Sequence, residues 1–268
     1  MLIDIDYHPY QGRVEKTKTY LTFTPQAPLN HWVQVLWQLN VPDGQYNYRS
    51  VPDNCVDLII NLASPEEAFI VTPFSASKVF EMTGPVSYFG IRFRILGHQG
   101  LISDPLGAWN KADNFINANE VLSEYMISSL FNGANKHLKF HDRCKHFSKV
   151  LLGSLQYNKV DSRLVNYARY CQQNICSSID LSDKRCSEFG VSARQLRRLS
   201  HLYLGLSPRE YAKVIRFQKT LHVMSSENCS SIWAQHYYDQ PHFIRDFKSL
   251  SGITPNEFRS SSVLYNTG

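Results

Sequence analysis

Hydrophobic and polar positions follow two different patterns along the chain. The first 110 residues contain short aromatic and β-branched runs that turn residues interrupt, namely YLTFTP, HWVQVLWQLNVPDG, CVDLIINLASPEE, AFIVTPF and SYFGIRFRILG. Runs of this length and composition are typical of antiparallel strands in a β-sandwich or β-barrel. We therefore predict a β-rich domain over residues 1–115.

The pattern changes after Asn117. Apolar residues then recur every three or four positions in VLSEYMISSLF and HLKFHDRCKHFSKVLLGSL, which indicates amphipathic helices. We predict that they form a helical connector over residues 116–158. The apolar face of its first helix would suit a dimer seam, and it would equally suit burial against the chain's own barrel.

The stretch LQYNKVDS, near residues 155–162, is polar and lacks a strong apolar period, so it is the best linker candidate. The pattern behind it is helical nearly to the end of the chain. We predict an all-α domain over residues 159–262. The fold class that follows is α+β, with a β-barrel, a helical connector and a helical C-terminal domain.

A seven-residue segment occurs twice in the helical part. GLSPREY, from Gly205, recurs 47 residues later as GITPNEF, from Gly252. In each copy glycine suits the left-handed end of one helix, and Ser or Thr suits the cap of the next. Proline then occupies the first helical position, and glutamate completes a capping box. The repeat predicts the same helix-to-helix corner used twice, and therefore a duplicated structural unit.

The residues before the first corner predict a helix-turn-helix. A short helix starts near Leu181, Gly190 relieves the backbone in a turn at residues 189–191, and Ser192 caps a second helix. Apolar positions on one face leave the polar side chains of that helix outward. These are Arg194, Gln195, Arg197, Arg198 and His201, and together with Ser192 they are the predicted DNA contacts of this unit. Because arginine pairs with guanine or phosphate and glutamine with adenine, the helix is suited to a DNA major groove.

A second unit precedes the second corner. Asp239 is its predicted cap, Pro241 lies in the first turn, and Phe243 and Phe247 face the core one helical turn apart. The side chains expected on or near its exposed side are Gln240, His242, Arg245 and Lys248. A continuous helix over residues 207–224, about 25 Å long at about 1.5 Å per residue, would separate the two units. Such a spacer suits two grooves that repeat about every 34 Å.

Charge supports this division. Residues 1–160 carry 14 Lys and Arg against 14 Asp and Glu, whereas residues 161–268 carry the other 14 basic residues against only 9 acidic ones. The whole net charge of +5 therefore lies in the C-terminal part. A basic domain of this kind favours a polyanionic partner, although solvated basic faces are common.

These motifs resemble one family. Residues 163–259 are similar to the AraC/XylS transcription regulators through GVSARQLRRL, GLSPREYAKVIRFQKTLHVM, YYDQPHFIRDFK and GITPNEFR, in the order and spacing of that family. The resemblance implies two helix-turn-helix units whose recognition helices enter successive grooves of double-stranded DNA. It assigns Arg194, Arg197 and Arg198 to the first helix's contact positions, and Gln240, His242 and Arg245 to those of the second.

Two residues depart from the family pattern. Ser200 stands where a core phenylalanine is usual, and His236 stands where glycine is usual, so we expect strain or loosening at these places. Pro241 also removes one base-reading side chain. We therefore expect the first unit to carry more of the sequence specificity than the second.

The N-terminal half is also similar to a sensor-type domain found before this module in some family members. The similarity rests on VPDNCVDLIINL, TGPVSYFGIRFRILG and LISDPLGAWN. It implies a small cupin-like barrel that binds an effector, followed by helices that often dimerise. It names no ligand.

Other chemistry is less favoured. His137, His141 and His146 are spaced by four and five residues, but no third ligand and carboxylate partner accompany them, and His31 and His98 are isolated. Cys55 is either a redox sensor or a packed core residue, and its apolar neighbours favour the second. We expect no metal and no cofactor. No phosphate loop, nucleophile elbow or paired-carboxylate signature is present, so we expect no enzymatic activity.

The six cysteines form no CxxC pair, and no apolar stretch reaches the roughly 20 residues of a membrane span. Together with the acidic start of the chain, these features predict a cytoplasmic protein without a membrane partner. The leading hypothesis is an effector-modulated, DNA-binding transcription regulator that contacts RNA polymerase, with a homodimer left open. The alternatives are a cupin-like metalloenzyme with a DNA-binding tail and a regulator controlled by a protein partner.

Overall fold

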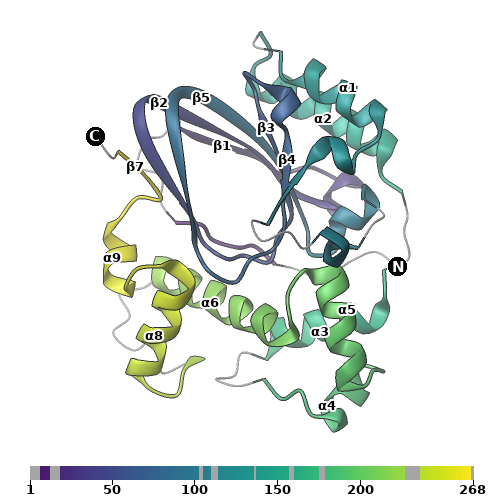
Figure 1. Cartoon of the computed structure of the whole chain (residues 1–268), viewed down its shortest axis with the longest axis vertical. Helices are drawn as coiled ribbons and strands as arrows, with labels where there is room; N and C mark the ends of the chain where they lie inside the picture. Colours follow the sequence, from purple (N-terminus) through teal and green to yellow (C-terminus); the bar gives the residue numbers. More distant parts are fainter. Residues whose placement is uncertain are drawn as a thin grey trace.

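The computed structural model describes residues 7–12, 19–102, 105–109, 114–135, 137–156, 160–174, 179–226 and 236–266. A strongly curved antiparallel sheet forms one part of the molecule, and two helices lie against it on one side (Figure 1). A layer of helices from the C-terminal part lies below the sheet in this view. The predicted fold class, α+β with a barrel-like sheet and a helical C-terminal part, is confirmed.

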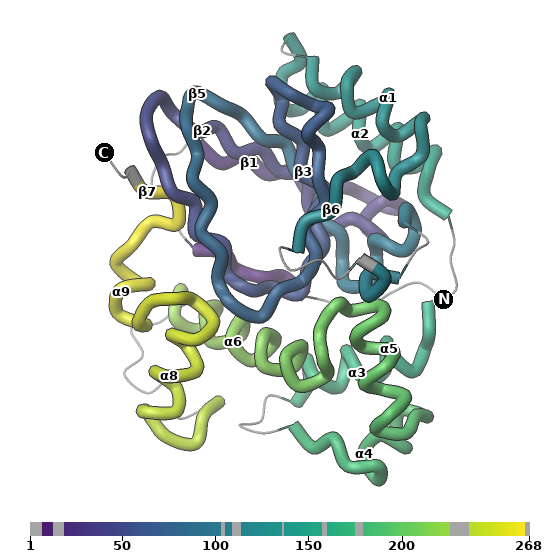
Figure 2. Tube along the Cα trace, in the orientation of Figure 1, coloured from purple at the N-terminus to yellow at the C-terminus, as the bar shows by residue number. Residues whose placement is uncertain are grey.

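The sheet has the strand order β1-β2-β5-β3-β4-β6. The strand bounds are β1 Tyr20–Phe23, β2 Val33–Ser50, β3 Asp57–Asn61, β4 Phe69–Val71, β5 Lys78–Phe93 and β6 Phe115–Asn117. Figure 2 shows the trace curling around an interior space. No pairing between the end strands β1 and β6 occurs in the described part of the chain, so the sheet is barrel-like without being closed.

Strands β2 and β5 are longer than the hydrophobic runs that predict them. Their antiparallel pairing extends from Val33 with Phe93 to Ser50 with Lys78, through a register shift between Val41 and Gly44. The residues PDG, which would suit a turn, form this bulge inside β2. A side chain at Gly84 would collide with the carbonyl oxygen of Pro42, so a glycine opposite the bulge is what lets the ribbon continue.

Helices α1 (Glu124–Gly133) and α2 (Phe140–Ser154) follow the sheet strands β1 to β6 in the chain. Met126 and Leu130 of α1 are buried in the barrel's own hydrophobic cluster, together with Phe147 of α2. The ring of Phe147 stacks on Phe89 of β5 at 4.9 Å between centroids. Burial against the chain's own barrel is therefore where the apolar face of α1 goes, while Tyr125 of the same helix is exposed.

The C-terminal part is helical. Its bounds are α3 Ser162–Gln173, α4 Asp183–Glu188, α5 Ala193–Leu204, α6 Pro208–Ser226, α8 Gln240–Ser251 and α9 Pro255–Ser260. The 19-residue α6 is about 28 Å long at about 1.5 Å per residue. Figure 1 shows α5 at one end of α6 and α8 at the other.

The β-rich part and the helical part are joined by a common hydrophobic cluster and by one strand pairing. The hydrophobic cluster of the helical part also contains Val51, Cys55 and Ile95 from the barrel side. Close to the end of the chain, β7 (Leu264–Asn266) pairs with β2. The short 3-10 turns lie at Leu29–His31, Pro65–Glu67, Gly97–Gly100, Leu106–Trp109 and Ala118–Glu120. The turn at Leu106–Trp109 packs on α5, since a side chain at Gly107 would lie 2.9 Å from the oxygen of His201.

Candidate nucleic-acid interface and interior cavity

The first helix-turn-helix consists of α4 and α5. Gly190 has φ +79° in the turn, as the sequence predicts, and Ser192 caps α5 in a capping box with Gln195. The carboxylate of Asp183 accepts a hydrogen bond from the backbone N–H of Ala193 at 2.9 Å, which joins the start of α4 to the start of α5. The N-terminal turn of α5 is therefore held rigidly by its own cap and by α4.

The polar face of α5 is open to solvent. Leu196 and Leu199 are buried, whereas the six predicted contact residues are exposed: Ser192, Arg194, Gln195, Arg197, Arg198 and His201. The side-chain oxygen of Gln195 accepts from the N–H of Ser192 at 3.1 Å. In a bidentate contact with adenine, this oxygen would have to accept from the base as well as from the cap.

The second unit exposes fewer of its predicted contact side chains. Asp239 caps α8 by accepting from the N–H of His242 at 2.7 Å. Gln240, Arg245 and Lys248 are exposed, but His242 is half-buried. Its ring meets Tyr237 edge to face, with 5.6 Å between centroids.

Helix α8 is fixed to α6 by ion pairs. The carboxylate of Asp246 contacts Lys213 at 3.0 Å and Arg216 at 2.5 Å. Two basic side chains of α6 are thus engaged within the protein. Tyr238, in the turn before α8, is 84% exposed and was not among the residues predicted from the sequence. An exposed aromatic side chain directly before a predicted recognition helix is a further candidate for DNA contact, and a count of charged residues does not find it.

Both repeat copies form the predicted corner. Gly205 and Gly252 end α5 and α8 with φ of +73° and +79°. The side chain of Glu210 accepts from the N–H of Ser207 at 2.9 Å, and that of Glu257 accepts from the N–H of Thr254 at 2.7 Å.

One of the two departures is accommodated. Ser200 is fully buried, and its hydroxyl donates to the carbonyl of Leu206 at 2.7 Å, so it supports the corner instead of leaving a polar atom unmatched. His236 is buried and directly follows residues outside the described part of the chain, so the strain expected there stays a prediction.

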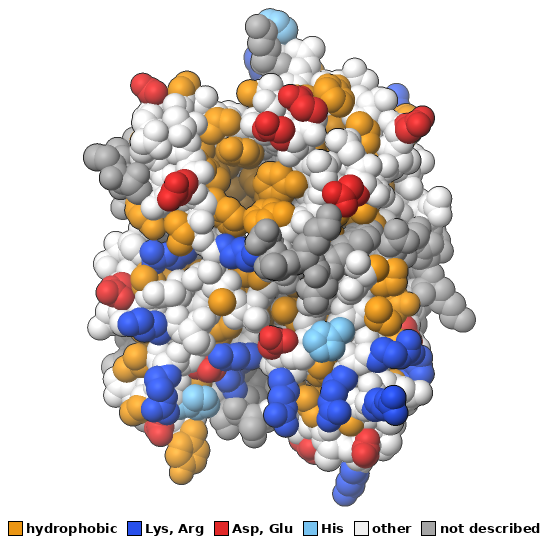
Figure 3. All heavy atoms as spheres, in the orientation of Figure 1, with side chains coloured by type: hydrophobic (Ala, Val, Ile, Leu, Met, Phe, Trp, Pro, Cys, Tyr) orange, Lys and Arg blue, Asp and Glu red, His pale blue; other side chains and the backbone are white. Residues whose placement is uncertain are grey.

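Basic side chains gather on the face formed by the helical part. Figure 3 shows Lys and Arg over the lower half of the molecule, around α5 and α8, while acidic side chains lie above and beside the opening of the barrel and basic ones lie along its lower edge. The contact residues that the sequence predicts thus lie on two helices whose basic sides belong to one face. The geometry suits a large anionic surface more than a small anion.

The barrel encloses a cavity of about 220 Å³. Its wall is largely aromatic, and the contributing rings include Tyr20, Trp37, Tyr48, Phe69, Phe80 and Phe115. Figure 3 shows a hollow with hydrophobic walls at the barrel's mouth. A cavity of about 150 Å³ already holds benzene, so this one has room for a small organic molecule.

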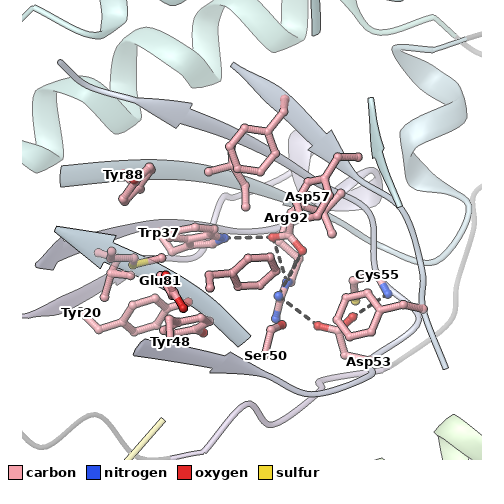
Figure 4. A pocket seen from close by; sticks show the side chains of 18 residues that line it. Tyr20, Trp37, Tyr48, Ser50, Asp53, Cys55, Asp57, Glu81, Tyr88 and Arg92 are labelled. Atoms are coloured by element: carbon pink, nitrogen blue, oxygen red, sulfur yellow. Dashed lines mark hydrogen bonds and ion pairs between the residues drawn. The ribbon is translucent and has the colours of Figure 1, made fainter. Parts of the chain in front are cut away.

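A buried ion cluster forms one wall of the cavity (Figure 4). The guanidinium of Arg92 contacts both oxygens of Asp57 through Nε at 3.1 Å, and its Nη2 lies 3.0 Å from Asp53 and from Asp57. The indole N–H of Trp37 donates to Asp57 at 2.9 Å. Sequence reasoning missed this cluster, although Asp53 belongs to the PDNC segment and Arg92 interrupts an apolar strand.

Electrostatics follow from burial. Burial alone would lower the pKa of Arg92, but Asp53 and Asp57 outweigh it and hold that pKa above its usual value. Burial raises the pKa of Asp53, and the guanidinium of Arg92 opposes this effect. Burial and the charge of Asp53 raise the pKa of the Cys55 thiol, so Cys55 is a packed neutral thiol and not a reactive thiolate.

Histidines that the sequence analysis weighed as metal ligands make structural contacts. The ring of His146 contacts the carbonyl of Ser129 at 3.1 Å, and His141 packs edge to face on Phe23. His98 is buried, and burial lowers its pKa to about 3. No group of three or more His, Cys, Asp or Glu that could hold a metal occurs among the described residues. Cys176 and Cys229 lie outside those residues.

Two known domain families each match part of the chain. A helix-turn-helix domain family matches residues 185–261, which contain α5, the corner at Gly205, α6, α8 and the corner at Gly252. The C-terminal part of the chain is an AraC-type helix-turn-helix domain. A domain of unknown function, DUF6597, matches residues 21–114. The AraC-type domain thus follows a β-rich domain, and the resemblance inferred from the sequence is confirmed.

No curated protein matches the chain. Among solved structures, an apo variant of ToxT from Vibrio cholerae strain SCE256 is 14% identical, with 92% of this chain and 98% of that chain covered and a TM-score of 0.42. ToxT from strain O395 bound to (E)-4-(8-methylnaphthalen-1-yl)but-3-enoic acid is 15% identical, with 90% and 98% covered and a TM-score of 0.42. Within the described residues, no helix is long and apolar enough to cross a membrane.

Proposed function

We propose that this DNA-binding transcription regulator reads two adjacent major grooves of double-stranded DNA with α5 and α8. The observation that carries the proposal is the pairing of two capped helices with exposed basic faces at the two ends of one rigid helix, α6. The contact residues would be Ser192, Arg194, Gln195, Arg197, Arg198 and His201 in the first unit and Gln240, His242, Arg245 and Lys248 in the second. Phosphate contacts would supply most of the affinity, and the bidentate arginines most of the discrimination.

The test is retention of genomic fragments by the purified full-length protein in about 150 mM salt, followed by sequencing, since that salt suppresses nonspecific phosphate binding. The proposal expects a motif of two short blocks about one helical turn apart. Retention without any shared motif would refute sequence-specific reading.

We further propose that a ligand in the barrel modulates DNA binding. The division into a sensor domain over residues 1–115, a connector over 116–158 and a DNA-binding domain over 159–262 is part of this proposal. Support comes from the segment PDNC, residues 52–55, which touches the cavity and α6 together. Asp53 and Cys55 line the cavity. Their neighbours Pro52 and Asn54 bind the helical part.

The contacts of this segment are direct. The amide of the fully buried Gln218 in α6 donates to the carbonyl of Pro52 at 2.7 Å. The amide of Asn54 donates to the carbonyl of Tyr211 at 3.0 Å. Asn54 has φ +59°, a conformation that asparagine tolerates better than most residues. A ligand that displaces Asp53 or Cys55 would therefore move groups bonded to α6.

A paired substitution tests this coupling. Asn54→Gly, which keeps the positive φ and removes the amide, and Gln218→Met should each leave ligand binding to the barrel in place and abolish the ligand's effect on operator affinity. Arg209→Met, on the exposed side of α6, is the matched control and should keep the effect. If the ligand still changed operator affinity fully in the Asn54 and Gln218 variants, the signal would not pass through residues 52–55.

The remaining sequence predictions join the proposal: contact with RNA polymerase, a homodimer as an open alternative, and a cytoplasmic location. A regulator controlled by a protein partner would show no ligand response in the same assay. No observation on the described residues favours the cupin-like metalloenzyme.

A further inference from the structure

We infer that the barrel cavity is built for an organic cation, an ammonium group on an aromatic or aliphatic body, and not for a carboxylate. This inference rests on the proposed role of the cavity as the effector site. It concerns the chemical class of the ligand, which the fold alone leaves open.

The first argument is the balance of charge in the cavity wall. The charged residues that line it are Arg92 and three acids, Asp53, Asp57 and Glu81. Arg92 is already bonded to two of these acids, so with both acids ionised the cluster has one guanidinium against two carboxylates. Burial raises the pKa of Asp53, and a bound cation would favour its ionised form. A carboxylate ligand would add a further negative charge in a space where charges are poorly screened, whereas a cation would balance the excess.

The second argument is the aromatic wall. Trp37, Tyr20 and Tyr48 surround the space next to the ion cluster, and rings on the opposite strands complete the wall (Figure 4). The faces of aromatic rings carry partial negative charge and attract ammonium groups, most strongly when water is excluded. An apolar ligand body would gain contact area from the same rings.

The third argument is the rim. Glu67 lies close enough to Tyr88, a lining residue, that its charge acts with burial to raise the pKa of that phenol. Figure 3 shows acidic side chains above and beside the barrel opening and basic side chains along its lower edge. An approaching cation would be attracted to the acidic part of the mouth before it enters.

One basic side chain, that of Lys78, does not line the cavity but lies next to two of the rings that do. The ammonium of Lys78 sits over the rings of Phe115 and Phe74, at 5.3 and 5.8 Å from their centroids. These two rings already interact with a cation of the protein itself, so the rings left for a ligand cation are those next to the ion cluster. Lys78 also defines the competing outcome, an anionic ligand anchored at the rim.

The experiment compares three probes of matched shape on the purified full-length protein: 3-phenylpropylammonium, 3-phenylpropanol and 3-phenylpropionate. Thermal shift and calorimetry should show the cation binding about tenfold more tightly than the alcohol, with the carboxylate weakest. Glu81→Gln should reduce the cation's advantage several-fold and leave alcohol binding unchanged. Asp53→Asn should do the same if that variant folds. Asp142→Asn, which removes the same charge from the exposed surface of α2, is the control.

The carboxylate binding as tightly as the cation would overturn the inference and place the anchor at Lys78. Failure of all three probes to stabilise the protein at about 1 mM would also overturn it. Operator binding is measured separately on the same preparations. A protein that binds the cation but no specific DNA would refute the proposed function alone, whereas specific DNA binding with a preference for the carboxylate would refute this inference alone.

Discussion

The two helix-turn-helix units share one frame and differ in chemistry. Each has a capped recognition helix that ends in a left-handed glycine and leads through a capping box into the next helix. Yet α5 exposes three arginines, whereas α8 exposes one arginine and one lysine and keeps His242 half-buried against Tyr237. The backbone signals that form a corner are therefore independent of the side chains that we propose as DNA contacts.

The supports of the two corners also differ. In the first, Ser200 donates to the carbonyl of Leu206 at 2.7 Å from a position one turn inside α5. In the second, the hydroxyl of Ser251, at the last position of α8, lies 2.7 Å from the equivalent carbonyl of Ile253 and 2.8 Å from the carbonyl of Phe247, and it can donate its single proton to either. Two serines at unrelated repeat positions can thus satisfy the same backbone group, because a buried carbonyl without a partner is costly.

The largest expected effect separates the recognition helices. Arg194→Ala and Arg197→Ala should each weaken base discrimination by about 1–3 kcal/mol, roughly 5- to 150-fold, because each guanidinium can pair bidentately with guanine. His242→Ala should change it little, since that ring already packs on Tyr237. Titration of the selected operator and its single-base variants measures this. Intact preference in both arginine variants, with its loss in His242→Ala, would reverse the ranking of the units.

The next effect separates the corner glycines. Gly205→Ala and Gly252→Ala should each lower the free energy of unfolding by about 1–2 kcal/mol, because alanine is strained at positive φ. Gly252→Ala should cost more. Its added carbon would lie 2.7 Å from Oγ of Ser77, whereas the nearest atom at Gly205 is 3.5 Å away. Urea unfolding measures both, and Ser77→Ala should remove the excess. If Gly252→Ala lowered the free energy of unfolding equally with Ser77 present and in the Ser77→Ala variant, the close approach of Gly252 to Ser77 would be contradicted.

A smaller effect concerns the serine supports. Ser200→Ala and Ser251→Ala should each cost about 1 kcal/mol of stability, because each leaves a corner carbonyl without its donor. Ser225→Ala is the control, since that hydroxyl is exposed and bonds only within its own helix turn. Thermal unfolding compares the three. A neutral Ser200→Ala would mean that the residue merely fills space.

The smallest effect concerns phosphate contacts. Lys248→Ala in α8 and Arg198→Ala in α5 should each weaken binding a few-fold on every sequence and reduce the slope of log affinity against log salt by about 1. Binding measured at several salt concentrations checks both. If either change altered the preferred sequence, that side chain would be a base contact instead.

The helical part could be predicted from the sequence because its signals are local. Gly190, Gly205 and Gly252 each require a conformation that only a few neighbouring residues determine, and the caps at Ser192 and Thr254 bond within three residues. The sequence pattern does not predict long-range pairings. Asp246 forms ion pairs with Lys213 and Arg216, which lie thirty or more residues away, so the sequence did not predict that these two basic side chains of α6 are engaged within the protein.

The barrel shows the same limit more strongly. Its strands followed from the hydrophobic runs, but the cavity depends on Asp57 and Arg92, which meet only because β3 pairs with β5. The extension of β2 through Pro42 and Gly44 depends on Gly84 opposite the bulge. The return of the chain end as β7 has no local signal in three residues. Such features follow from pairing register, which a hydrophobic pattern does not specify.

The most direct test of the two-groove account is selection of operator sequences by the full-length protein, by Arg197→Ala and by Arg245→Ala, in parallel at about 150 mM salt. The account predicts two blocks about one helical turn apart for the unaltered protein. It predicts that Arg197→Ala degrades one block and that Arg245→Ala degrades the other. A single block, or loss of the same block in both variants, would contradict it.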